Sequence, residues 1–127
     1  MANKLKILYV DDEVMNLFLF ENLMAQHFEV LTADSPEKAL EILHNENDIQ
    51  LVISDMKMPK MNGLQFIKKA KEFHDHCPYL ILSGYHKGEE LMEALETGLI
   101  LDYLQKPYEV SDIAQSINNA IETFNKE

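Results

Sequence analysis

The fold is determined by the segment Leu5-Lys6-Ile7-Leu8-Tyr9-Val10-Asp11-Asp12, in which a nearly continuous apolar run ends on two adjacent carboxylates. Such a run is typical of a strand that is buried on both faces of a parallel sheet. Three later apolar runs also end on a polar side chain: Leu51–Ser54 on Asp55, Tyr79–Leu82 on Ser83, and Leu101–Gln105 on Lys106. If these runs are neighbouring parallel strands, their polar residues meet at the carboxyl edge of one sheet, where ligands bind in open α/β folds.

Strand-like and helix-like patterns alternate five times along the chain. The sequence predicts strands near residues 5–10, 29–33, 50–54, 78–82 and 101–105, and helices near 14–27, 36–46, 63–74, 88–97 and 109–124. Five βα repeats predict an α/β fold with a doubly wound parallel sheet, a flavodoxin-like sandwich of three layers. We expect the strand order 2-1-3-4-5, with the switch point between the first and third strands, which carry the carboxylates.

Length and composition narrow the class of protein. At 127 residues we expect one domain over 1–127, either a complete small protein or the first part of a longer one. A net charge of −11 and the absence of arginine argue against nucleic acid binding. A single cysteine, Cys77, fits a reducing compartment. Since no signal-peptide pattern or long apolar run occurs, we expect a cytoplasmic protein without a membrane partner.

The polar ends of these runs carry a family resemblance. The motifs are Val10–Glu13, Asp55–Pro59 with Asn62-Gly63, Ser83-Gly84, and Tyr103–Pro107. In this order and at these spacings, the chain resembles the receiver (CheY-like) domain of two-component response regulators over essentially its whole length. The resemblance implies a phosphoacceptor switch in signal transduction, which takes a phosphoryl group from a sensor histidine kinase or a histidine phosphotransfer protein. Such a domain catalyses its own modification and is not an enzyme that turns over a separate substrate.

Asp55 is the expected phosphoacceptor, because a carboxylate can attack phosphorus and form an acyl phosphate. The expected cofactor is Mg²⁺, which prefers oxygen donors and keeps several of its waters. The resemblance implies that Asp12 and Asp55 bind the metal, that Asp11 acts largely through water, and that the Lys57 backbone carbonyl is a further ligand. Lys106 is expected to pair with Asp55 at rest and with the phosphoryl group after transfer, as suits a compact cation.

The resemblance also implies a switch. Ser83 would donate its hydroxyl to the phosphoryl group, and Tyr103 would turn inward when Ser83 moves. The signal would alter the face formed by residues 88–97, 101–105 and 109–124, and phosphorylation-dependent homodimerisation is one form that this output could take. The Lys106–Pro107 bond is expected to be cis.

Features outside these motifs also suggest roles. Lys57 and Tyr85 are expected to rim the phosphorylation site, and Gly63 to supply turn geometry. His74-Asp75-His76-Cys77 does not match a familiar zinc spacing, so we interpret this segment as a loop at a helix end. The first helix carries more apolar residues than one face needs, and Leu17 and Phe18 are expected to be exposed as a docking patch.

Two other functions remain open from the sequence. One is a Mg²⁺-dependent phosphohydrolase with an aspartate nucleophile, although Met56 and Lys57 stand where such enzymes usually place a second acid–base carboxylate. The other is a phosphorylation-independent adaptor of the same fold. The intact set of polar residues argues against the adaptor: Asp11, Asp12, Asp55, Ser83 and Lys106.

Overall fold

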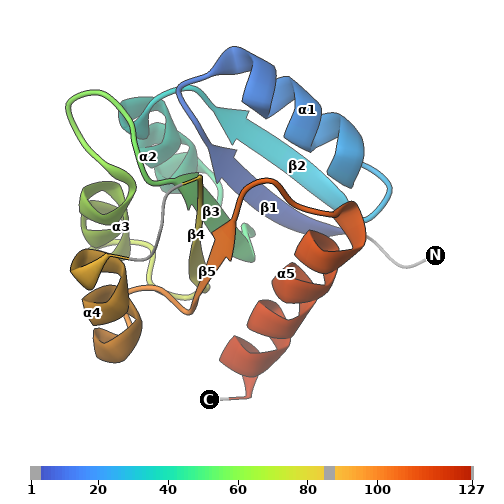
Figure 1. Ribbon diagram of the computed structural model, residues 1–127. Coiled ribbons are helices and arrows are strands. Elements are labelled where there is room, and N and C mark those ends of the chain that lie inside the picture. The colour runs from blue at the N-terminus through green and yellow to red at the C-terminus, as the bar shows by residue number, and fades with distance from the viewer. Residues whose placement is uncertain (1–3, 85–87, 127) are drawn as a thin grey trace.

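A computed structural model describes residues 4–84 and 88–126. In this part of the chain, strands and helices alternate in a single parallel sheet of order β2-β1-β3-β4-β5, which confirms the predicted α/β topology (Figure 1). The strands are β1 (Leu5–Val10), β2 (Phe28–Ala33), β3 (Leu51–Asp55), β4 (Tyr79–Ser83) and β5 (Asp102–Gln105). The helices are α1 (Val14–Met24), α2 (Pro36–Asn45), α3 (Gly63–Lys71), α4 (Glu89–Thr97) and α5 (Val110–Asn125).

The sheet lies between two layers of helices. Helices α2, α3 and α4 cover one face, and α1 and α5 cover the other (Figure 1). Successive side chains of a strand point to opposite faces. Accordingly, Leu8 and Val10 of β1 belong to the core under the first layer, whereas Ile7 and Tyr9 belong to the core under the second. Burial on both faces explains why the central strands are apolar almost without interruption.

Helix α1 departs from expectation in two respects. It ends at Met24 and not near residue 27, because β2 already begins at Phe28. A turn joins α1 to β2, and in this turn the His27 amide donates to the Met24 carbonyl. The expected exposure of Leu17 is wrong, because this side chain is buried in the core under α1 and α5. Phe18 is 65% exposed, and Val14, Met15 and Leu19 are exposed beside it. The apolar surface of α1 therefore exists, but Leu17 is not part of it.

Candidate functional site

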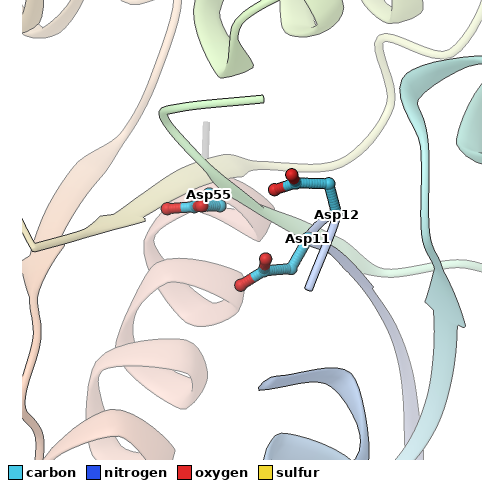
Figure 2. Close-up of side chains that lie close together, drawn as sticks. All are labelled: Asp11, Asp12 and Asp55. Carbon is cyan, nitrogen blue, oxygen red and sulfur yellow. The ribbon is translucent and has the colours of Figure 1, made fainter. Parts of the chain in front are cut away.

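The strand register brings the predicted site residues to one edge of the sheet. Val10 of β1 pairs with Ser54 of β3, so Asp11 and Asp55 are the next residues on adjacent strands. Ser83 of β4 pairs with Gln105 of β5, and the Lys106 amide donates to the Ser83 carbonyl. Figure 2 shows Asp11, Asp12 and Asp55 converging above this edge. One carboxylate oxygen from each lies within 4.8 Å of the others.

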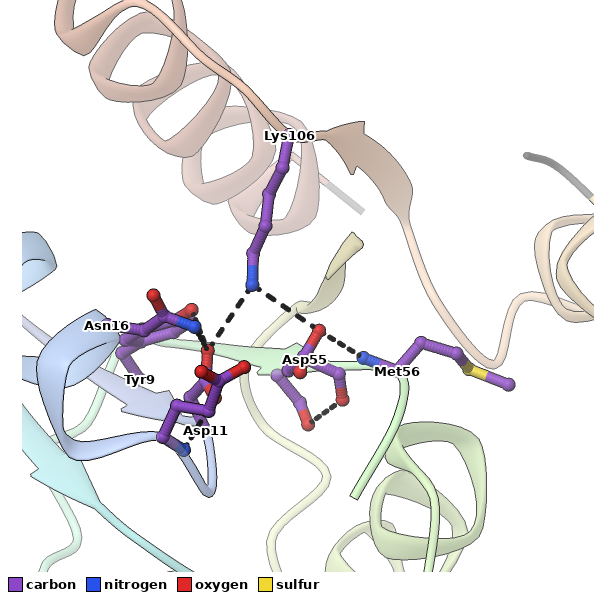
Figure 3. A network of polar contacts seen from close by, with 8 residues as sticks. Tyr9, Asp11, Asn16, Asp55, Met56 and Lys106 are labelled. Atoms are coloured by element: carbon purple, nitrogen blue, oxygen red, sulfur yellow. Dashed lines mark hydrogen bonds and ion pairs between the residues drawn. The ribbon is translucent and has the colours of Figure 1, made fainter. Parts of the chain in front are cut away.

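The Asp11 carboxylate is fully buried and is held from several sides (Figure 3). Its Oδ1 accepts a hydrogen bond from the Glu13 amide at 2.9 Å. Its Oδ2 accepts from the Tyr9 hydroxyl at 2.6 Å, from the Asn16 side-chain amide at 3.1 Å, and from Lys106 Nζ at 3.4 Å. Burial, and then the Asp11 carboxylate, raise the pKa of Tyr9, so its hydroxyl stays protonated and donates. Donors therefore surround this buried charge, as a buried carboxylate requires.

Lys106 lies between the two buried carboxylates, Asp11 and Asp55, whereas the sequence suggested only the contact with Asp55. Its Nζ lies 3.4 Å from Asp11 Oδ2 and 3.6 Å from Asp55 Oδ1, and Asp55 Oδ1 also accepts from the Met56 amide at 3.0 Å. Burial raises the pKa of Asp55 to about 6, with Lys106 opposing this effect and the Asp11 carboxylate adding to it. Lys106 by itself does not balance the charge of three carboxylates. The Lys106–Pro107 peptide bond is cis, as predicted.

An open cleft of about 700 Å³ leads from solvent to these groups. Among the residues that line it are Asp12, Asp55, Lys57 and Lys106. Asp12 is exposed, in contrast to Asp11, and lines the cleft. Lys57 lies at the cleft as expected, whereas Tyr85 lies outside the described residues. The Asp55 side chain is therefore reached from solvent through this cleft.

Gly63 has a different role from the expected turn geometry. A Cβ atom on this residue would lie 2.4 Å from the Asp55 carbonyl oxygen and 2.9 Å from the Ile81 side chain. The Gly63 amide donates to the Met56 carbonyl at 2.8 Å, and Asn62 and Gln65 form a reciprocal capping box at the start of α3. Glycine is therefore required because α3 begins in direct contact with the backbone of Asp55.

The two predicted switch residues lie on neighbouring strands. Ser83 is fully buried at the end of β4, beside the cleft residue Gly84. Tyr103 is half-buried in β5, where it pairs with Ile81 and packs against the core under α2, α3 and α4. On α4, Leu91 is buried and Met92 is exposed. Ser83 therefore lies next to the cleft, and Tyr103 lies on the neighbouring strand against the core that α2, α3 and α4 cover.

The histidine-rich segment after α3 does not gather metal ligands. Within residues 4–84 and 88–126, the acidic triad is the one group of three or more His, Cys, Asp or Glu side chains that could hold a metal ion. His74 is buried, and its ring lies 4.1 Å from that of His76. This agrees with the interpretation of the segment as a loop. In the same part of the chain, no helix has the length and apolarity needed to cross a bilayer.

Comparison with known proteins identifies the family. A model of the "Response regulator receiver domain" matches residues 7–118, so the chain belongs to this family of two-component signal transduction domains. A response regulator receiver domain protein from Clostridium thermocellum superposes with a TM-score of 0.86 at 37% identity, covering 93% of this chain and 94% of that one.

Two curated relatives differ in length. The two-component response regulator ORR3 of Oryza sativa is 30% identical over 118 residues, which cover 91% of this chain and 89% of that protein. The transcriptional regulatory protein ZraR of Escherichia coli is 32% identical over 120 residues, which cover 94% of this chain but 27% of that protein. The chain thus spans most of one relative and about a quarter of the other.

The acidic triad is consistent with a metal site of the kind that receiver domains carry. Clustered carboxylate oxygens suit a hard divalent cation, which would offset the charge that Lys106 leaves. Sequence reasoning gave neither Tyr9 nor Asn16 a role in this site. For Tyr9 a signal was present, because a residue two positions before Asp11 in a strand points to the same face of the sheet.

Proposed function

We propose that this protein is a phosphoacceptor switch and that Asp55 accepts the phosphoryl group. The observation that carries the proposal is the placement of Asp55: its carboxylate lies at an open cleft, beside two further carboxylates and 3.6 Å from Lys106. The donor would be a phosphohistidine of a sensor histidine kinase or a phosphotransfer protein. An oxygen of Asp55 attacks phosphorus, the O–P bond forms as the P–N bond breaks, and the departing imidazole retains the electron pair and takes up a proton.

The residues of the cleft have separate tasks in this transfer. Asp12 and Asp55 would hold Mg²⁺, with the Lys57 backbone carbonyl as a further ligand and Asp11 acting through water. When bound, the metal offsets the negative charge that develops on the phosphoryl oxygens. Lys106 contacts a phosphoryl oxygen once transfer has occurred, and its flexible side chain suits that exchange of partners. Ser83 donates its hydroxyl to the same group.

The output follows from a shift between conformations that pre-exist. Ser83 moves toward the phosphoryl group, Tyr103 turns inward, and the surface of α4, β5 and α5 changes its association, with homodimerisation as one form of output. We further propose that residues 1–127 form a single cytoplasmic receiver domain that does not itself bind nucleic acid. The output of any longer protein that contains it would require other domains, as the length of ZraR illustrates.

Incubation with acetyl phosphate and Mg²⁺, followed by intact mass measurement, tests the proposal. We expect one added phosphoryl group on the wild type and none on Asp55→Asn. Asp34→Asn is a matched control, because Asp34 is exposed and follows β2 at the same edge of the sheet without belonging to the acidic triad. Labelling of Asp55→Asn at the wild-type level would refute the assignment, whereas turnover of a small phosphate ester would favour a phosphohydrolase.

A further inference from the structure

Tyr9 presents its hydroxyl to the site from a rigid position in the core. Its side chain is 1% exposed, and its ring stacks on Phe20 with the centroids 4.2 Å apart and the planes 26° apart. Phe20 in turn meets the edge of the Tyr108 ring at 6.5 Å. Because these contacts enclose the ring, its hydroxyl cannot leave the Asp11 carboxylate without disturbing the core under α1 and α5.

The Tyr9 hydroxyl shares its acceptor atom with Lys106. Both donate to Asp11 Oδ2, but the distance from Tyr9 is 2.6 Å and that from Lys106 Nζ is 3.4 Å. The Asn16 amide is a third donor to this atom, at 3.1 Å. A carboxylate oxygen has few acceptor directions, so donors that are already bound limit how closely the ammonium approaches. Lys106 consequently lies almost midway between Asp11 and Asp55 Oδ1, which is 3.6 Å away.

We propose that Tyr9, assisted by Asn16, is a positioning residue for the phosphorylation site. Its hydroxyl holds the Asp11 carboxylate in one orientation and keeps Lys106 shared between Asp11 and Asp55. Without that hydroxyl, Lys106 moves toward Asp11 and away from the phosphoacceptor, and Asp11 loses the orientation from which it supports the metal. This inference rests on the proposed function, because it assigns a residue that prepares the same site.

A buried tyrosine hydroxyl needs a hydrogen-bond partner whether or not it positions a functional group. Tyr79 is a control that distinguishes this general requirement from a positioning role. Tyr79 is likewise 1% exposed, and its hydroxyl donates at 2.6 Å to the His74 carbonyl. It stands at the start of β4, at the opposite edge of the sheet from the acidic triad. Tyr79→Phe therefore removes an equally buried and equally short hydrogen bond without touching the site.

The experiment compares Tyr9→Phe and Tyr79→Phe with the wild type in three measurements. The first is the ¹⁵Nζ resonance of Lys106 in the metal-free protein, the second is the dissociation constant of Mg²⁺ by calorimetry, and the third is the rate of labelling by acetyl phosphate at saturating Mg²⁺. In Tyr9→Phe we expect a shifted Lys106 resonance, Mg²⁺ binding about threefold weaker, and labelling about tenfold slower, since one hydrogen bond to a charged group is lost. Tyr79→Phe is expected to match the wild type in all three measurements.

Asn16→Ala keeps the proposal testable if Tyr9→Phe does not fold, because Asn16 is only half-buried. A smaller change in the same direction is expected for this variant. The proposal is overturned if Tyr9→Phe and Tyr79→Phe behave alike, if Mg²⁺ binds more tightly to Tyr9→Phe, or if Asn16→Ala leaves the Lys106 resonance and the metal affinity unchanged. Absence of labelling in the wild type would instead count against the proposed function. The Lys106 resonance and the Mg²⁺ affinity would still test the role of Tyr9.

Discussion

Replacing Asp55 with asparagine should stabilise the metal-free protein at neutral pH, even though it removes the proposed phosphoacceptor. The substitution keeps the size of the side chain and an oxygen that can accept from the Met56 amide. It removes one of three carboxylates that lie together, two of which are buried. An ionised group in such a place destabilises the folded state, because burial and the neighbouring Asp11 charge both oppose ionisation.

The magnitude follows from the raised pKa. Asp55 has a pKa of about 6 in the folded protein against an ordinary value of 3.8. A difference of about 2 in pKa corresponds to about 3 kcal/mol. The folded state binds this proton more tightly than the unfolded state, so the wild type gains stability as the pH falls from about 6 toward 4. This pKa already includes the opposing attraction of Lys106, so we expect a gain of about 1–3 kcal/mol at pH 7.

The assay is urea unfolding with EDTA present, followed by circular dichroism since the chain has no tryptophan. The difference in unfolding free energy between Asp55→Asn and the wild type should be about 2 kcal/mol smaller at pH 4.5 than at pH 7. Asp34→Asn, at an exposed position, is the control and should change stability little at either pH. If Asp55→Asn is less stable than the wild type at pH 7, or if the difference does not depend on pH, the raised pKa of Asp55 is wrong.

Four further predictions follow from the same structure. Gly63→Ala should lower stability by about 1–3 kcal/mol and slow the labelling of Asp55, because the added Cβ would overlap the Asp55 carbonyl. Gly88→Ala is the control and should do neither, because the space around Gly88 is open. Thermal unfolding measures the stability, and intact mass measures the labelling. Burial, and then the neighbouring His76, lower the pKa of His74, so below about pH 6.5 the unfolded state takes up a proton that the folded state resists. Acidification should therefore destabilise the wild type more than His74→Gln. An equal loss of stability in both proteins would refute the lowered pKa of His74. Mg²⁺ should raise the unfolding temperature of the wild type but not of Asp12→Ala, and an equal rise in both would remove Asp12 from the ligands. With a net charge of −11, the chain should give no gel shift with DNA, and a salt-sensitive shift at micromolar protein would contradict this.

The sequence by itself determined the fold and the main groups of the site, because both depend on local patterns. Runs such as Leu5–Val10 reveal buried strands, and helix starts such as Ser35-Pro36 carry their own capping signals. Once the strands are parallel, Asp11, Asp55 and Lys106 must meet at one edge, since each directly ends or follows a strand. The predicted order 2-1-3-4-5 is confirmed for the same reason.

Only the tertiary structure decided which neighbours act on those groups. Gly63 is required by its contact with the Asp55 backbone, and that contact depends on how α3 packs against the end of β3. The hydrogen bond from Tyr9 to Asp11 depends on ring packing in the core under α1 and α5. Helix α1 is the clearest case: it is apolar nearly all round, so its periodicity does not indicate which side faces the sheet. Leu17 and Phe18 are both apolar, but the way in which α1 packs buries Leu17 and leaves Phe18 in solvent. Burial therefore depends on the neighbouring elements and not on the side chain itself.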